Sequence, residues 1–407
     1  MTERGQFEAG LRRTAPPGPL PSESEPALLD KIRAEIALSG PMTFARFMAI
    51  ALYDPEHGYY RSATERPSRA GDFLTAPETH PIFGAAVARQ LDEVWRRLDR
   101  PGRFVLREYG AGSGTLAATI LAGLRSDGSG LVDAISYEPV EINAHRQAQI
   151  DARLGPLAQA AAGVGSPSSS GPRPARFVGA ALANEFLDAL PVHRVEQRDG
   201  RLWERLVEWD DASGQLREQP SQPSTPALAA RLARDGVTLV EGQVAEICLE
   251  VEPWLAEVAA DLERGLVVII DYGHRAPALY DPVRTGGTLR AYAGHRAHAN
   301  PFIAIGRQDL TAHVDLTALE AAARAHRLDL LGDVSQAEFL VGCGLEELVD
   351  RVRSSPATTM EEWLAIRSAV ARLLDPAALG GFRVVLLGRG LEPRMRLRGL
   401  SAYPPGV

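Results

Sequence analysis

The chain has 407 residues, which is enough for one large domain or two ordinary domains with a sizeable hydrophobic core. Its 44 basic and 52 acidic residues give a formal net charge of -8, so nothing in the composition suggests a nucleic-acid partner held by bulk charge. The two cysteines, Cys248 and Cys343, fit neither a metal-binding spacing nor a disulfide framework, which favours a reducing compartment.

The chain contains no long apolar segment. No run of apolar residues approaches the ~18 that a transmembrane helix needs, so we expect no membrane insertion. Residues 1–26 are rich in proline and do not resemble a signal peptide. We therefore expect a soluble cytoplasmic protein with a flexible tail over residues 1–26.

Residues 27–100 are predicted to form a helical cap. Apolar residues recur at helical spacing over residues 27–38, and Thr43 can cap the next helix. Two loops, residues 53–60 and 71–78, are rich in tyrosine, glycine and polar side chains, which suggests a lid over a site. The alternative is a cap whose tyrosines only pack. A long amphipathic helix over residues 82–98 then leads to the first strand.

A glycine-rich turn follows that strand. Three apolar residues, 104–106, lead to Glu108, and glycines then stand at positions 110, 112 and 114 before a helix over residues 116–124. Such a turn lets a ligand approach the backbone closely, because no Cβ is in the way and positive φ is freely adopted. The pattern indicates a cofactor-binding turn, and the alternative is a turn that binds nothing.

Charge and spacing distinguish between cofactors. In the dinucleotide fingerprint Gly-x-Gly-x-x-Gly, the helix amino terminus faces an anionic pyrophosphate. Here Gly114 comes one residue early, and Thr115 holds the place of the third glycine. Glu108 adds negative charge where a pyrophosphate would lie. The turn therefore favours a cofactor that carries positive charge, such as S-adenosyl-L-methionine (SAM).

The next two strands also end in polar side chains. Residues 132–138 are predicted to form a short strand that ends in Glu138, where nucleotide folds bind a ribose diol; the alternative is an ordinary strand-end carboxylate. After a helix over residues 142–154, residues 155–174 are predicted to be a flexible excursion. A strand over residues 178–183 then opens into Asn184 and Glu185, which are candidates for the reaction centre.

The second half of the chain begins with an antiparallel pattern. Alternating residues after position 192, with Asp199 and Gly200 as a hairpin turn, predict an insertion for substrate contacts or a homodimer surface. The strand over residues 266–270 ends in Asp271. Four predicted strand ends therefore carry an acid: Glu108, Glu138, Glu185 and Asp271.

The last predicted elements complete the sheet. Asp315 is expected to cap a helix over residues 316–326. Strands over residues 328–331 and 382–387 are separated by helices, so the last strand returns late to the sheet. His274 and His313 could titrate near neutrality and act as bases, and the alternative is a structural role.

These motifs together resemble a known family. The segment Glu108-x-Gly110-x-Gly112-x-Gly114-Thr115-Leu116 resembles the first motif of class I SAM-dependent methyltransferases. With Gly71-Asp72-Phe73 and residues 184–191, 271–273 and 309–311, in that order, the chain resembles the MidA family from about residue 27 to residue 387. That family includes the mitochondrial complex I assembly-factor methyltransferase.

The resemblance implies a fold and a reaction. The fold is α/β, a doubly wound class I methyltransferase (Rossmann-like) sheet of seven strands, with an N-terminal helical cap and an antiparallel β insertion. The expected cofactor is SAM. For the mitochondrial member the resemblance implies arginine methylation on a partner protein, so a protein substrate is expected, with a respiratory complex subunit as a candidate.

The expected roles follow from this reading. Carboxylates can hold a guanidinium by paired hydrogen bonds, so Glu185 and Asp271 are the first catalytic candidates and Asp188 is the third, with helix capping as its alternative. No metal site is expected. The expected cofactor-binding residues are Glu108, Gly110, Gly112, Gly114, Thr115, Glu138, Asn184, Gly71, Asp72 and Phe73.

The chain departs from the family at Ala111, Ser113 and Ala76, where proline, arginine and serine are usual. Substrate identity therefore does not transfer directly. One alternative is an assembly factor or chaperone that binds SAM without transferring the methyl group. A weaker one is a nicotinamide-dependent oxidoreductase, against which Glu108 and the early third glycine argue.

The expected organisation divides the chain into six segments. They are a flexible tail (1–26), the helical cap (27–100), the first half of the SAM-binding core (101–191), the insertion (192–250), the second half of the core (251–390) and a second tail (391–407).

Overall fold

The computed structural model describes residues 23–62, 75–155, 176–293, 296–392 and 396–401. Most of the expected first tail, most of the expected excursion after residue 155, and Gly71, Asp72 and Phe73 lie outside the described residues.

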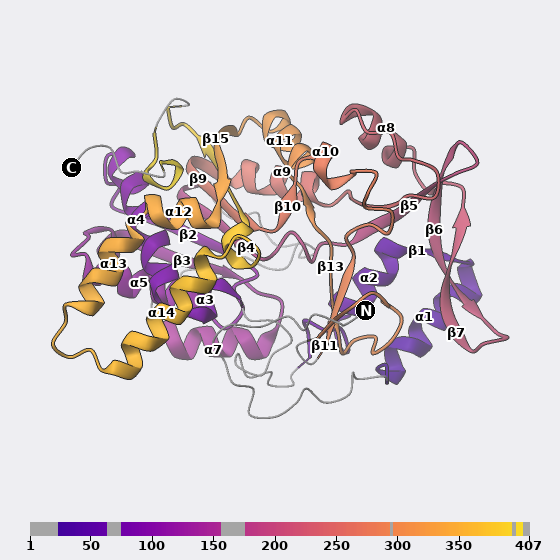
Figure 1. Ribbon diagram of the computed structural model, residues 1–407, viewed down its shortest axis with the longest axis horizontal. Helices are drawn as coiled ribbons and strands as arrows, with labels where there is room; N and C mark the ends of the chain where they lie inside the picture. The colour runs from indigo at the N-terminus through magenta and orange to yellow at the C-terminus, as the bar shows by residue number, and fades with distance from the viewer. Residues whose placement is uncertain (1–22, 63–74, 156–175, 294–295, 393–395, 402–407) are drawn as a thin grey trace, which may run out of the picture.

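A mixed sheet forms the centre of the fold (Figure 1). Its strand order is β15-β16-β9-β4-β2-β3, and neighbours among β3, β2, β4 and β9 are parallel, whereas β16 is antiparallel to both β9 and β15. The sheet has six strands in the described part of the chain, where the resemblance implied seven. Its strands are β2 (Phe104–Tyr109), β3 (Ile135–Val140), β4 (Phe177–Asn184), β9 (Leu262–Asp271), β15 (Asp329–Ser335) and β16 (Arg383–Arg389).

Helices cover both faces of this sheet, and alternate strand residues therefore enter two different cores. Val268 and Ile270 of β9 pack in the core with helices α4 and α5, while Val267 and Ile269 pack in the core with α9 and α11. Burial on both faces explains why these strands are continuously apolar rather than alternating. The predicted doubly wound α/β fold is confirmed. The covering helices are α4 (Ile82–Arg97), α5 (Thr115–Ser126), α9 (Val251–Asp261) and α11 (Leu316–Ala325).

The antiparallel insertion and the first two helices form one unit. Strand β1 (Met42–Thr43) pairs with β6 (Arg201–Asp210), and α2 (Phe44–Tyr53) shares a core with both. In Figure 1 these elements lie together on the right, with β7. Helix α4, expected in the cap, packs instead on α5 of the central core. The expected cap is therefore divided between two units.

Local signals for this unit are confirmed. The Thr43 hydroxyl accepts a hydrogen bond from Arg46 N at 3.1 Å and so caps α2. Asp199 (φ 52°) and Gly200 (φ 70°) both take left-handed backbone between β5 and β6, as a type I′ hairpin requires.

The remaining elements complete the two units. A helical turn over Leu131–Ala134 includes residues 132–134, which the sequence predicted to be strand. The other helices are α1 (Pro26–Ser39), α3 (Ala76–Thr79), α6 (Leu131–Ala134), α7 (Ala144–Leu154), α8 (Ala227–Arg234), α10 (Ala276–Leu279), α12 (Gln336–Gly342), α13 (Leu345–Arg353) and α14 (Met360–Leu374), with 3-10 turns η2 (Leu379–Gly381) and η3 (Arg398–Leu400). The other strands are β5 (Val192–Arg198), β7 (Gln215–Ser221), β8 (Val244–Cys248), β10 (Gly273–His274), β11 (Arg290–Ala293), β12 (Arg296–His298), β13 (Asp309–Thr311) and β14 (Val314–Asp315).

The described part of the expected second tail packs against the core. Leu391 and Leu397 are buried, and Gly399 N donates to Gln90 Oε1 on α4 at 3.0 Å. The described residues of this segment are therefore part of the packed fold. Of the helices in the described ranges, none is long and apolar enough to cross a membrane.

Candidate functional site

The candidate site lies where neighbouring parallel strands end. Tyr109 at the end of β2 pairs with Ala183 of β4, and Asn184 pairs with Ile270 of β9. Because the carboxyl ends of parallel strands meet at one edge of a sheet, the residues that follow these three strands lie close together.

The glycine turn after β2 has the backbone that its sequence indicated. Gly110, Gly112 and Gly114 have φ of 65°, 56° and 73°. A Cβ on Gly110 would lie 3.1 Å from Phe186 Cδ2, and one on Gly114 would lie 3.1 Å from Ile150 Cγ1, whereas one on Gly112 would meet nothing closer than 4.0 Å. Packing thus restricts the two outer glycines, while Gly112 borders open space that a ligand can use.

Thr115 begins helix α5 and is held within the turn. Its hydroxyl lies 2.9 Å from Ser113 Oγ, and Arg153 Nη1 contacts it as well as Ser113 O. The Thr115 hydroxyl therefore stabilises the conformation of the turn through contacts within the protein.

Glu108 is buried inside β2 beneath the turn. Its Oε2 accepts a hydrogen bond from the Tyr137 hydroxyl at 2.6 Å. Burial raises the pKa of Glu108 to about 7; the Tyr137 hydrogen bond opposes that rise and the nearby Glu141 carboxyl adds to it.

The prediction that Glu138 ends its strand is wrong. Strand β3 continues through Pro139 to Val140, and Glu138 is buried within it. Arg107 Nε and Nη2 donate to Glu138 Oε2 at 3.1 and 2.9 Å, and Arg107 Nη1 donates to Asp261 Oδ2 at 2.8 Å. Glu138 therefore balances a buried guanidinium.

Glu141 occupies the strand-end position instead. It follows β3 directly, and its Oε2 accepts a hydrogen bond from Gly112 N at 2.8 Å. Its Oε1 accepts from Asn143 N at 2.8 Å, and burial raises its pKa. The sequence reasoning missed this residue because the predicted strand began and ended too early; Asn143, the cap of α7, was the available signal for the later end.

Glu185 follows β4 in a strained conformation. Its φ is 49°, a left-handed value that non-glycine residues seldom adopt and that is enriched at functional sites. Its Oε1 accepts hydrogen bonds from Ala76 N at 3.1 Å and Asn184 Nδ2 at 3.2 Å. Burial raises the pKa of Glu185 to about 8, and the Asp188 carboxyl adds to the rise.

Asp271 is held differently, with both oxygens bonded to backbone N–H groups. Oδ2 accepts from Phe186, Leu187 and Asp188 at 3.2, 2.9 and 3.2 Å, and Oδ1 accepts from Tyr272 N at 2.9 Å. Burial and then the charge of Glu185 raise the pKa of Asp271 to about 7, and these N–H groups oppose that rise.

Asp188 completes a cluster of three carboxyls, in which Asp188 and Asp271 are buried and Glu185 is half-buried. No helix begins within residues 185–191, so the alternative of helix capping does not apply. Burial, followed by the charge of Asp271, raises the pKa of Asp188 well above its usual value, and the Tyr272 hydroxyl opposes this by hydrogen bonding. Such a cluster is suited to a cation, which would relieve the repulsion between its members.

The pKa values of both histidines are lowered from the ordinary value of histidine. Burial lowers the pKa of His313 to about 4, and the nearby His274 adds to the effect. Burial also lowers the pKa of His274. The His313 ring packs edge-on against Tyr272 at 5.2 Å between ring centroids, which fits a structural role.

Residues of the N-terminal segment also reach this edge. The Tyr53 hydroxyl donates to Ala189 O at 2.8 Å, and the Tyr60 hydroxyl donates to Asp309 Oδ1 at 2.7 Å. The sequence marked residues 53–60 as a tyrosine-rich loop, but it contained no signal that pairs Tyr60 with Asp309.

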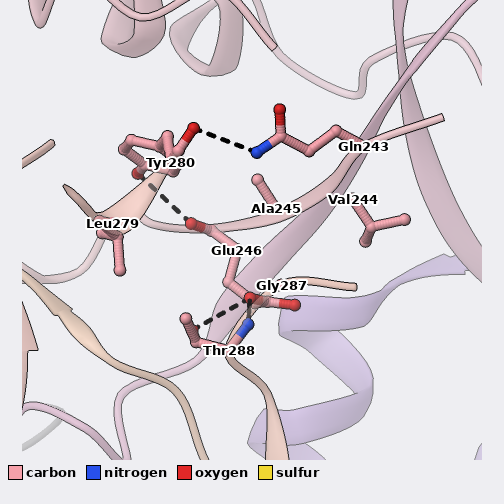
Figure 2. A pocket seen from close by; sticks show the side chains of 8 residues that line it. All are labelled: Gln243, Val244, Ala245, Glu246, Leu279, Tyr280, Gly287 and Thr288. Atoms are coloured by element: carbon pink, nitrogen blue, oxygen red, sulfur yellow. Dashed lines mark hydrogen bonds between the residues drawn. The ribbon is translucent and has the colours of Figure 1, made fainter. Parts of the chain in front are cut away.

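A separate small pocket surrounds Glu246 (Figure 2). Glu246 Oε2 accepts from Thr288 N at 2.6 Å and Oγ1 at 3.1 Å, and Tyr280 and Gln243 are hydrogen-bonded beside it. The space is about that of one water molecule, so this pocket reflects packing between β8 and its neighbours.

The glycine turn and strand ends fit SAM on structural grounds. A ligand can approach the backbone at Gly112, and Asn184 Oδ1 is a buried acceptor without a hydrogen-bond partner among the described residues. An acceptor oxygen and several carboxyls match a cofactor that carries an ammonium and a sulfonium group.

Comparisons with known proteins indicate the same cofactor. The model of a family described as "Putative S-adenosyl-L-methionine-dependent methyltransferase" matches residues 86–334. A Drosophila melanogaster protein, the mitochondrial protein arginine methyltransferase NDUFAF7 homolog, is 30% identical over 91% of this chain and 88% of its own length. Mouse (Mus musculus) protein arginine methyltransferase NDUFAF7, also mitochondrial, is 32% identical over 81% and 76%.

A solved structure is similar over nearly the whole chain. It is a Burkholderia thailandensis protein bound to S-adenosyl-homocysteine, with 34% sequence identity and a TM-score of 0.78, covering 92% of this chain and 94% of that one. The segment that the family model matches, residues 86–334, includes both Gly110 and Glu185. The chain therefore belongs to the MidA family of SAM-dependent methyltransferases.

Proposed function

We propose that this enzyme methylates a protein side chain, with arginine as the acceptor. The observation that carries the proposal is the strained Glu185, whose half-buried carboxyl lies with Asp188 and Asp271 at the strand edge that also bears the glycine turn. The relatives named protein arginine methyltransferase support arginine.

On the cofactor side, Gly110, Gly112, Gly114 and Asn184 would hold SAM, with Glu108 below the turn. We assign the ribose hydroxyls to Glu141 rather than Glu138, because Glu141 lies beside Gly112 at the end of the strand. Bound SAM supplies a methyl group on a positively charged sulfur. The turn and strand ends align that methyl with the acceptor and exclude water, which is most of what an in-line displacement requires.

On the acceptor side, Glu185 and Asp188 would bind the guanidinium. Charge-assisted hydrogen bonds to two carboxylates hold the plane of the group and keep its positive charge on the nitrogens that do not react. The attacking nitrogen would form a bond to the methyl carbon while the bond from that carbon to sulfur breaks, so that S-adenosylhomocysteine leaves. The nitrogen loses one proton in this step, and Glu185 is placed to accept it. The bound guanidinium favours the ionised form of Glu185, and a carboxylate with a raised pKa is a stronger base.

Asp271 takes a positioning role in this proposal, although the sequence favoured it as catalytic. Its oxygens are occupied by the backbone N–H groups of residues 186–188 and 272, so it holds the turn that carries Glu185 and Asp188.

The test is transfer of a labelled methyl group to proteins of a host lysate. The full chain and a Glu185→Gln variant are incubated with methyl-labelled SAM, and labelled residues are identified by mass spectrometry. We expect label on arginine with the wild type and loss of that label with the variant. Label on another residue type would refute the arginine assignment.

S-adenosylhomocysteine (SAH) binding without any label would favour the alternative, an assembly factor that binds the cofactor only. A respiratory-complex substrate, a homodimer and a cytoplasmic location stay predictions, and the relatives' names place those proteins in mitochondria.

A further inference from the structure

Residues 53–62, which we call the bridging segment, connect helix α2 with both sides of the site. The segment is anchored at its start, where Asp54 Oδ1 accepts from Glu56 N and His57 N at 3.1 Å each. Its backbone then returns to α2, because Tyr60 N donates to Leu52 O at 2.9 Å. Tyr59 N likewise donates to Ala51 O of α2 at 3.0 Å.

Asn143 joins this segment to the cofactor side. Its side chain is buried, and Nδ2 donates to Tyr60 O at 2.8 Å and to Ser62 O at 3.1 Å. Its backbone N–H donates to Glu141 Oε1, whose partner oxygen accepts from Gly112 N. A continuous series of hydrogen bonds therefore runs from the glycine turn to Tyr60.

Asn143 also caps helix α7, since its Oδ1 accepts from His145 N at 2.9 Å and Arg146 N at 3.3 Å. Capping alone does not require an amide, because serine caps helices about as well as asparagine. A serine at position 143 could still cap α7, but it would lose the two hydrogen bonds that the amide Nδ2 donates to the bridging segment.

The side chains of Tyr60 and Tyr53 reach the acceptor side. The Tyr60 hydroxyl donates to Asp309, the Tyr53 ring stacks on Tyr60 with 5.6 Å between centroids, and the Tyr53 hydroxyl holds the carbonyl of Ala189. Ala189 directly follows Asp188 in the carboxyl cluster. The same ten residues thus touch both halves of the site.

We infer that Asn143 is a positioning residue that couples the cofactor side to the acceptor side. A ligand that fixes Gly112 and Glu141 also fixes Asn143. Through Asn143 the ligand then fixes the placement of Tyr60 against Asp309. This rests on the proposed function, since it takes SAM at the glycine turn and the acceptor at Glu185. Coupling of this kind requires only that the ligand favour one arrangement of the series.

The test is amide hydrogen exchange of the full chain with and without SAH, read over the bridging segment. Calorimetry first measures SAH affinity for the wild type, for Asn143→Ser and for Thr359→Ala, which removes the cap of the distant helix α14. We expect SAH to slow exchange of the segment about five-fold or more in the wild type and in Thr359→Ala, and less than about two-fold in Asn143→Ser.

Each result of the exchange and binding measurements either supports or overturns the role of Asn143. Equal slowing in the wild type and Asn143→Ser overturns the inference, and so does absence of slowing in a wild type that binds SAH. A serine variant that binds SAH more than about ten-fold more weakly also overturns it, because Asn143 would then belong to the cofactor site itself. A wild type that does not bind SAH refutes the proposed function instead, so the two failures are distinguishable.

Discussion

Asp271 holds the backbone of the three residues that directly follow Glu185. Its Oδ2 accepts hydrogen bonds from Phe186, Leu187 and Asp188, the three residues that follow Glu185. Glu185 in turn donates its own N–H to Ile270 O at 2.8 Å, so strand β9 holds the turn from both sides.

Asp271→Asn should therefore act through stability and geometry together. Replacing one oxygen with an amide leaves buried N–H groups without an acceptor, and we expect the free energy of unfolding to fall by about 2 kcal/mol or more. Urea denaturation measures this, with the exposed Asp329→Asn on β15 as the control. A variant as stable as wild type would contradict the positioning role.

Glu185→Gln should separate binding from transfer. Its side chain keeps nearly the same shape but cannot take a proton, so we expect SAH affinity within about three-fold of wild type and transfer reduced at least ~100-fold. Calorimetry and label incorporation measure the two. Full transfer by this variant would exclude Glu185 as the base.

Gly112→Val should abolish SAH binding. The residue has φ of 56°, which a β-branched side chain strains, and its Cβ would enter the space that the ligand uses. Gly128→Val is the matched control, because Gly128 has φ of 63° and also has open space around it, in the loop after α5. Equal SAH affinity for Gly112→Val and wild type would refute the cofactor assignment of the turn.

Glu141→Gln should weaken SAH binding, whereas Glu138→Gln should lower stability. We expect the first to weaken SAH binding about ten-fold, since it loses a charged acceptor beside Gly112. The second should leave affinity nearly unchanged but lower the free energy of unfolding by about 3 kcal/mol, because Arg107 loses one of its buried partners. The reverse pattern would restore the original assignment of Glu138.

Stability should fall as the pH rises from about 5 to 8. The pKa of Glu185 is about 8 in the folded protein and near the ordinary glutamate value of 4.5 when unfolded, so in that window the native state holds a proton that the unfolded state has lost. The free energy of unfolding then decreases with pH, by at most about 1.4 kcal/mol per unit for this group. Urea denaturation at several pH values should give a smaller decrease for Glu185→Gln, and an unchanged slope would contradict the raised pKa.

Much of the sheet and of the cofactor side could be predicted from the sequence. The glycines at 110, 112 and 114 and the apolar run before Asp271 are local signals, because they depend on backbone freedom and on burial of both sheet faces. The sequence placed the end of β3 at Glu138, whereas the strand continues to Val140. Pro139 is tolerated there because β3 pairs only with β2 among the described strands.

Other features depend on contacts that no local pattern encodes. The hydrogen bond between Tyr60 and Asp309 joins residues that are 249 positions apart. In the sequence, Glu185 and Asp271 look alike, because both are acids at strand ends. Their proposed roles, base and positioning residue, differ because backbone N–H groups occupy the oxygens of Asp271.

The pairing of β1 with β6 has a consequence for how the chain is made. Met42 lies opposite Val207, 165 positions later (207 minus 42), so the ribosome needs roughly 8 to 33 seconds after the first strand emerges before its partner exists. During that interval the apolar side chains of Phe44, Phe47 and Met48 have no sheet to cover them. Nascent chains of this protein should therefore bind chaperones early in translation and release them only after the hairpin at Asp199 has left the exit tunnel.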